Sequence, residues 1–162
     1  MLPTPGNNEV INAVPNASGI AVIDLTASAL ADIPSFQINL AGASSLIFNV
    51  SGTSVTFSAN DGSGSSGANH IWNFLDAGTV SLDNQIGGTV LAPDATVAND
   101  NQIDGALVAD NFKGQGELHD NLFDGAMPPT ALPEPGSLVL LATGLIGLGV
   151  AVRRRRARGY PA

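Results

Sequence analysis

The chain has 162 residues and a formal net charge of −8 at pH 7, which is enough length for one modest domain and a tail. All 14 acidic residues precede Arg153, whereas Lys113 is the only basic residue ahead of that position. An acidic body of this kind repels phosphate backbones, which argues against nucleic-acid binding. Cysteine is absent, so disulfides and thiolate metal sites are excluded.

The first sixty residues predict short β-strands. Apolar residues alternate with small polar ones in four segments separated by Gly, Pro, Asn or Ser, which is the pattern of half-buried strands. The four segments are Ile20–Leu25, Ser35–Leu40, Ser45–Val50 and Ser54–Ser58. The next segment, 60–69 (NDGSGSSGAN), has almost no side chain that packs in a core, and it is predicted to be a surface loop.

An internal repeat follows the segment 71–74 (IWNF), which holds the only Trp. Residues 79–93 (TVSLDNQIGGTVLAP) match residues 96–110 (TVANDNQIDGALVAD) at eight of fifteen positions when the two are offset by 17. Each copy has two apolar runs that are too short to bury themselves but that can pair in parallel with the next copy. A weaker third copy, 120–125 (DNLFDG), is predicted 20 residues after 100–105 (DNQIDG).

These repeats predict a mostly β fold with a parallel β-solenoid-like (β-helix) body, in which one 17-residue copy forms one coil. A β-sandwich is the alternative, because 17 residues also fit two strands and two turns. Gly88 and Gly105 are expected where the chain turns sharply or takes a positive φ angle. Asn84 and Asn101 are expected to form hydrogen bonds within the turns.

The composition changes abruptly after residue 126. Residues 127–135 form a Pro-rich linker, and residues 136–152 (GSLVLLATGLIGLGVAV) contain no ionisable side chain. At about 1.5 Å per residue, a helix of that length nearly matches the hydrocarbon thickness of a bilayer. We therefore predict one C-terminal transmembrane α-helix over residues 136–152. Residues 153–162 then form an Arg-rich cytoplasmic tail, because basic residues remain on the inner side of the membrane.

The C-terminal segment contains the motif Pro133, Glu134 and Pro135, followed by the apolar span and by a basic stop signal formed by Arg153, Arg154, Arg155 and Arg156. This order of features resembles the PEP-CTERM sorting signal of Gram-negative bacteria. It implies recognition by an exosortase, which is a membrane-embedded cysteine transpeptidase, with cleavage near Pro-Glu-Pro. The protein would span the membrane once before processing, with its body outside the cytoplasm, and would then reach the cell surface or the extracellular matrix. The family is associated with exopolysaccharide and biofilms, which makes a surface polysaccharide a candidate partner.

The body, residues 1–126, contains four segments with a recognisable pattern: 71–74 (IWNF), 88–93 (GTVLAP), 103–105 (IDG) and 116–119 (GELH). Through these segments it resembles the C-terminal half of the choice-of-anchor A domain of surface proteins. The same coils are similar to the β-solenoids of ice-binding adhesins, although Thr79 and Thr96 alone do not make the flat Thr face that ice binding needs. The family domain is longer on its N-terminal side, and the first eight residues lack the features of a signal peptide. We therefore expect an N-terminally truncated product.

No enzyme active site is predicted. The only histidines, His70 and His119, lack a neighbouring nucleophile or a second metal-ligating His, and ordinary surface or turn positions are expected for both. Weak Ca²⁺ candidates are the repeated acids Asp83, Asp100 and Asp104, because rows of carboxylates can supply oxygen ligands; solvated turn residues are the plainer interpretation. No cofactor is predicted.

The sequence thus predicts an exported bacterial surface or matrix protein with a structural or adhesive role. Two alternatives remain. One is a secreted polysaccharide-acting enzyme, which would need two carboxylates facing each other across a cleft. The other is a single-pass membrane protein that keeps its helix and is never processed.

Overall fold

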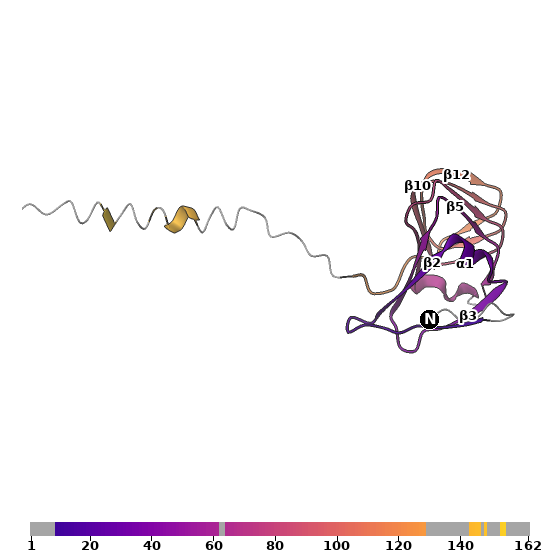
Figure 1. Ribbon diagram of the computed structural model, residues 1–162, viewed down its shortest axis with the longest axis horizontal. Helices are drawn as coiled ribbons and strands as arrows, with labels where there is room; N and C mark the ends of the chain where they lie inside the picture. The colour runs from indigo at the N-terminus through magenta and orange to yellow at the C-terminus, as the bar shows by residue number, and fades with distance from the viewer. Residues whose placement is uncertain (1–8, 62–63, 129–142, 147, 149–152, 155–162) are drawn as a thin grey trace, which may run out of the picture. The chain divides into compact units, whose positions relative to one another are not determined.

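The computed structural model describes residues 9–61, 64–128, 143–146, 148 and 153–154 (Figure 1). It divides the chain into two compact units, Met1–Pro128 and Pro129–Ala162. The strands and helices of the first unit are β1 (Glu9–Asn12), β2 (Ile20–Thr26), α1 (Ala27–Ala31), β3 (Ser35–Asn39), β4 (Ser45–Ser51), β5 (Ser54–Phe57), β6 (Asn60–Asp61), η1 (Gly64–Asn69, a 3₁₀ helix), β7 (His70–Phe74), β8 (Thr79–Leu82), β9 (Ile86–Gly87), β10 (Thr89–Asn99), β11 (Ile103–Asp104), β12 (Leu107–Gly114) and β13 (Leu118–His119).

Every strand pair in the described part of the chain is parallel. A seven-stranded sheet has the order β2-β4-β7-β10-β8-β5, with β12 paired to β10, and two three-stranded sheets have the orders β1-β3-β6 and β13-β11-β9. The first half of β10 pairs with β7 and its second half with β8, so the sheet curls around the core (Figure 1). The predicted mostly β, parallel architecture is confirmed, and the antiparallel sandwich is wrong.

Residues that match in the 17-residue repeat lie opposite each other on neighbouring strands. Thr79 lies opposite Thr96 between β8 and β10, and Ile86 lies opposite Ile103 between β9 and β11. The predicted third copy is wrong, because Asp104 lies opposite His119 and not opposite Asp124. The last pass of the chain, residues 107–119, is shorter than the earlier one, and we call it the last coil.

Four aromatic side chains fill the centre of the body. Trp72 stacks on Phe48 with ring centroids 4.0 Å apart, and it makes edge or tilted contacts with Phe57 and Phe36 at 5.2 and 5.9 Å. All four are at most 1% exposed. The indole Nε1 of Trp72 donates to the Gly87 carbonyl at 3.0 Å. Aromatic packing of this kind adds to simple burial, so this cluster anchors the coils to one another.

The four predicted strands correspond closely to β2, β3, β4 and β5. The sequence analysis did not predict helix α1, which begins after Thr26. The Thr26 hydroxyl caps the helix by accepting from the Ala29 N–H at 3.1 Å, and Leu30 is the residue of the helix that is buried in the core. The segment 60–69 is not simply a loop, because β6 and η1 lie within it. Gly67 is buried, and a Cβ there would lie 2.4 Å from the backbone of Gly87.

Only short pieces of the C-terminal unit are described. Residues 143–146, 148, 153 and 154 are helical. Within the described residues, no helix has the length and apolar character needed to cross a membrane. Most of the predicted transmembrane span 136–152 lies outside the described residues, as do the motif Pro133–Pro135 and Arg155–Arg156.

Candidate functional site

One face of the curled sheet presents small hydroxyl side chains in two rows. The rows run across β5, β8 and the second half of β10, where Ser54, Thr79 and Thr96 are opposite one another in register, and Thr56 is opposite Ser81. We call these five residues the hydroxyl face. Their strand neighbours, such as Val55, Val80 and Val97, point inward and are at most 2% exposed. Alternation along these three strands therefore places the hydroxyl side chains on the outer side of the sheet, where Ser54, Thr56 and Thr79 are exposed and Ser81 and Thr96 are half-buried.

The spacing of the hydroxyl face follows from the sheet. Neighbouring strands are about 4.8 Å apart, and residues i and i+2 on one strand are about 6.8 Å apart. Thr79 Oγ1 donates to Ser54 Oγ at 3.1 Å, which orients one row, and Ser81 Oγ donates to Asp83 Oδ1 at 2.6 Å. None of the five side chains is ionisable. The face can therefore offer a repeating set of hydroxyl and methyl groups to a regular, uncharged surface.

The sequence underestimated this face. It identified Thr79 and Thr96 through the repeat, but it gave no reason to place β5 beside them, because β5 lies 25 residues before β8 and outside the repeat. Ser54 and Thr56 complete the rows only once the sheet order β10-β8-β5 is known. Two threonines thus become a patch of five hydroxyls.

A second polar cluster lies around His119 on β13. His119 Nδ1 is 2.7 Å from Asp104 Oδ1, and His119 Nε2 is 2.9 Å from Glu117 Oε2. Hydrogen bonds to Glu117 and Asp104 raise the pKa of His119 above its ordinary value. Asp104 Oδ2 also accepts from the Nε2 atoms of Gln85 and Gln102, at 2.6 and 3.2 Å. Because both ring nitrogens of His119 face carboxylates, and one of these belongs to Asp104 on β11, the cluster holds β13 of the last coil to β11.

His70 is not at the surface, contrary to the prediction. It is 1% exposed, and its ring meets Phe48 edge to face with centroids 6.5 Å apart. Its Nδ1 has no hydrogen-bond partner among the described residues. Burial lowers the pKa of His70, and the carboxylate of Asp61 partly opposes this. His70 therefore belongs to the core.

The predicted Ca²⁺ candidates have protein partners of their own. Asp83 accepts from Ser81, and Asp100 Oδ1 is 3.5 Å from Gln115 Nε2. Asp104 is 7% exposed and so is not the solvated turn residue of the plainer interpretation. In the described ranges, no group of three or more His, Asp or Glu side chains is placed to hold a metal ion.

The two glycines expected at turns lie where consecutive coils approach closely. Gly88 has a φ of +107°, as predicted, and a Cβ there would lie 2.6 Å from the His70 carbonyl oxygen. Gly105 is required for a different reason, because its Cβ would lie 1.9 Å from the carbonyl oxygen of Gly88. Asn84 also differs from the prediction: its Nδ2 donates to the Ser58 carbonyl of the preceding coil at 2.6 Å, not within its own turn.

The described body is a curled parallel β-sheet with small hydroxyl side chains on one face, and the comparisons with known families assign it to a surface-adhesive class of protein. A family model described as "Putative Ice-binding-like adhesive domain" matches residues 3–120, and the chain belongs to this family. A second model, the PEP-CTERM protein-sorting motif, matches residues 131–156. No curated protein and no solved structure gives a significant match.

The comparisons confirm the two resemblances that the sequence suggested. The sorting motif is the one predicted, and the domain is of the expected adhesive type, although the family model describes it as ice-binding-like and does not name choice-of-anchor A. The chain is therefore an exported surface protein that carries the signal processed by exosortases. Both matched families are adhesive or sorting types and neither is enzymatic.

Proposed function

We propose that this protein is an adhesive module of the bacterial cell surface, with a β-solenoid body that binds matrix polysaccharide through the hydroxyl face. The rows formed by Ser54, Thr79 and Thr96 and by Thr56 and Ser81 carry the proposal. Polysaccharide chains display hydroxyl groups at regular intervals, and a rigid row of hydroxyls can pair with them without first ordering its own side chains. None of the five side chains is ionisable and Ser81 donates to the nearby Asp83 carboxylate, which favours a ligand rich in hydroxyl groups over an anionic one.

The C-terminal segment supplies the attachment in this proposal. Residues 136–152 form the membrane-spanning helix before processing, Arg153–Arg156 remain at the cytoplasmic side, and an exosortase cleaves near Pro133–Pro135. Support comes from the match to the sorting motif and from the uncharged composition of the span. Mass spectrometry of the mature C-terminus from producing cells tests this step. A C-terminus that still includes Arg153–Arg156 would contradict processing.

The adhesive step is tested by co-sedimentation with extracellular polysaccharide purified from producing cells. Thr56→Lys places a charge on the hydroxyl face, at its edge strand β5, because Thr56 is exposed between the buried Val55 and Phe57. We expect binding to fall by about tenfold, which corresponds to about 1.4 kcal/mol. Gln37→Lys is the matched control, since Gln37 is an exposed strand residue of a different sheet. Equal binding by both variants would rule out the hydroxyl face as the contact.

Ice is a second candidate ligand, because the family description names an ice-binding-like domain and the face is built from Ser and Thr. Inhibition of ice recrystallisation by the unmodified chain, lost in Thr56→Lys and kept in Gln37→Lys, would assign ice to this face. An inactive chain in that assay would leave polysaccharide as the proposed ligand.

A further inference from the structure

The apolar core is open at one end of the body. Three inward-facing rows of the sheets end in the last coil, where Leu107, Phe112 and Leu118 lie opposite Val90, Val97 and Ile103. The earlier members of these rows are fully buried, whereas Phe112 is 44% and Leu118 is 52% exposed. Stacked repeats need a polar terminal unit to cover such an end, and no described residue covers this one.

The opposite end of the seven-stranded sheet is covered. Helix α1 packs against β5 and β2, the two strands that end the order β2-β4-β7-β10-β8-β5, and Leu30 of the helix is 1% exposed. A copy of the chain therefore cannot continue the stack from head to tail. The two ends of the body are thus not equivalent, and the last coil is the end at which inward-facing rows of the sheets finish in exposed residues.

The last coil also offers backbone hydrogen-bonding groups. Among the described residues, β12 pairs with β10 and β13 pairs with β11, and neither strand has a second neighbour. The free edge of β12 consists of residues 107–109 and 111–114, the two stretches that pair with β10 on either side of a register shift, and such an edge is a template for another strand unless charges or prolines protect it. β12 (LVADNFKG) contains no Pro and one residue of each charge.

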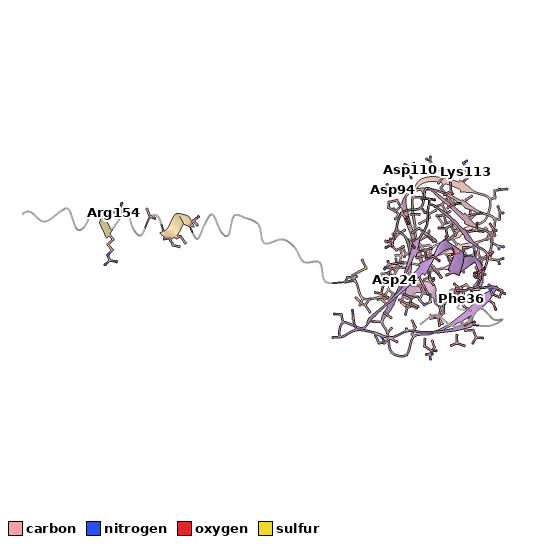
Figure 2. All side chains as sticks on the ribbon, viewed as in Figure 1. Asp24, Phe36, Asp94, Asp110, Lys113 and Arg154 are labelled. Atoms are coloured by element: carbon pink, nitrogen blue, oxygen red, sulfur yellow. The ribbon has the colours of Figure 1, made fainter. Side chains whose placement is uncertain are left out.

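The two charges on β12 make its edge complementary to itself. Lys113 is the only basic residue before Arg153, and Asp110 lies three residues earlier on the same strand. Figure 2 shows both side chains at the same end of the body. When two copies of a strand meet in antiparallel directions, the Lys113 end of each approaches the Asp110 end of the other. Elsewhere the acidic bodies repel each other, so this edge is where a second copy is best tolerated.

We propose that a second copy of this chain docks on the last coil, edge to edge and related by a two-fold axis. The two β12 strands pair in antiparallel fashion, and the exposed Phe112 and Leu118 side chains of the two copies cover each other. An isologous contact of this kind closes after two copies, so it produces a dimer and not a fibre. The hydroxyl faces of both copies then belong to one bivalent particle.

Single-cysteine crosslinking tests the proposal directly, because the chain has no cysteine of its own. The full chain is held in nonionic detergent and treated with a short bismaleimide at low micromolar concentration. Asn111→Cys places the thiol on β12, and Gln37→Cys, on an exposed position of β3, is the control. We expect a covalent dimer from Asn111→Cys and not from Gln37→Cys. Equal crosslinking by the two variants would overturn the proposal.

Charge variants in the Asn111→Cys background give a second readout that does not disturb the core. Both Asp110 and Lys113 are exposed, so their substitution leaves the buried rows intact. Lys113→Glu is expected to weaken dimer formation on the order of fivefold, since two exposed ion pairs are lost at once and become repulsive. The exchange Asp110→Lys with Lys113→Asp is expected to restore it. Sedimentation velocity showing a monomer at all concentrations, or equal association by all variants, would overturn the proposal.

Discussion

Replacing Gly105 by Ala tests how closely the coils stack. The added Cβ would lie 1.9 Å from the carbonyl oxygen and 2.5 Å from the carbonyl carbon of Gly88, both of which are backbone atoms. A flexible side chain could move away, but the Gly88 backbone is held by the bond from its N–H to the Asp104 carbonyl at 2.9 Å. The coils must therefore separate, and overpacking of this kind costs about 1–3 kcal/mol.

The matched control is Gly78→Ala. The nearest atom to a Cβ at Gly78 is the Thr53 carbonyl oxygen at 3.7 Å, an ordinary contact distance. Both substitutions restrict the unfolded chain equally, which favours folding by about 0.4–1 kcal/mol. We therefore expect Gly78→Ala to be neutral or slightly stabilising and Gly105→Ala to lose about 2 kcal/mol, which lowers Tm by on the order of 10 °C. Circular dichroism melts measure both, and melting temperatures within about 2 °C of each other would refute the close stacking.

Two further substitutions test the core and the last coil. Trp72→Phe removes the indole donor to the Gly87 carbonyl and leaves a cavity beside Phe48, so we expect a loss of about 2–4 kcal/mol in urea denaturation; a loss under about 1 kcal/mol would contradict the central role of this cluster. His119→Gln tests the pH dependence. The bonds to Glu117 and Asp104 raise the pKa of His119, so its stabilisation is complete below the ordinary value of 6.5 and is lost as the pH rises through the raised pKa. The variant should therefore be more destabilised, relative to the parent chain, at about pH 5.5 than at about pH 8.5, and a pH-independent difference would contradict the contribution of this proton.

Strands that carry a strict alternation were predictable from the sequence. β5 (SVTF) alternates polar and apolar residues, and its burial follows that alternation, whereas β2 begins with the apolar run Ile20–Ile23 and its burial does not alternate. The register between β8 and β10 was also predictable, because identical residues stack in parallel neighbours and so preserve the repeat. Local pattern and pairing agree wherever the repeat is intact.

Features that depend on distant segments were not predictable. The burial of His70 depends on β7 lying between β4 and β10, and no local signal gives that order. The last coil was misplaced because its residues have lost the similarity to the repeat while the backbone pairing persists: Phe112 lies opposite Val97, 15 residues away and not 17. Backbone hydrogen bonds tolerate such changes, whereas sequence comparison does not.

The chain between the last coil and the sorting segment returns to the body before it leaves. Ser45 Oγ donates to the Ala126 carbonyl at 2.6 Å, and the Asp124 N–H donates to the Ala68 carbonyl at 2.7 Å. A force applied at residue 128 through an anchored C-terminus would therefore act first on these two hydrogen bonds. They join the exit segment to β4 and to η1. Tension on an attached cell would then be transmitted to β4 and η1 before it reached β13, the last strand of the body.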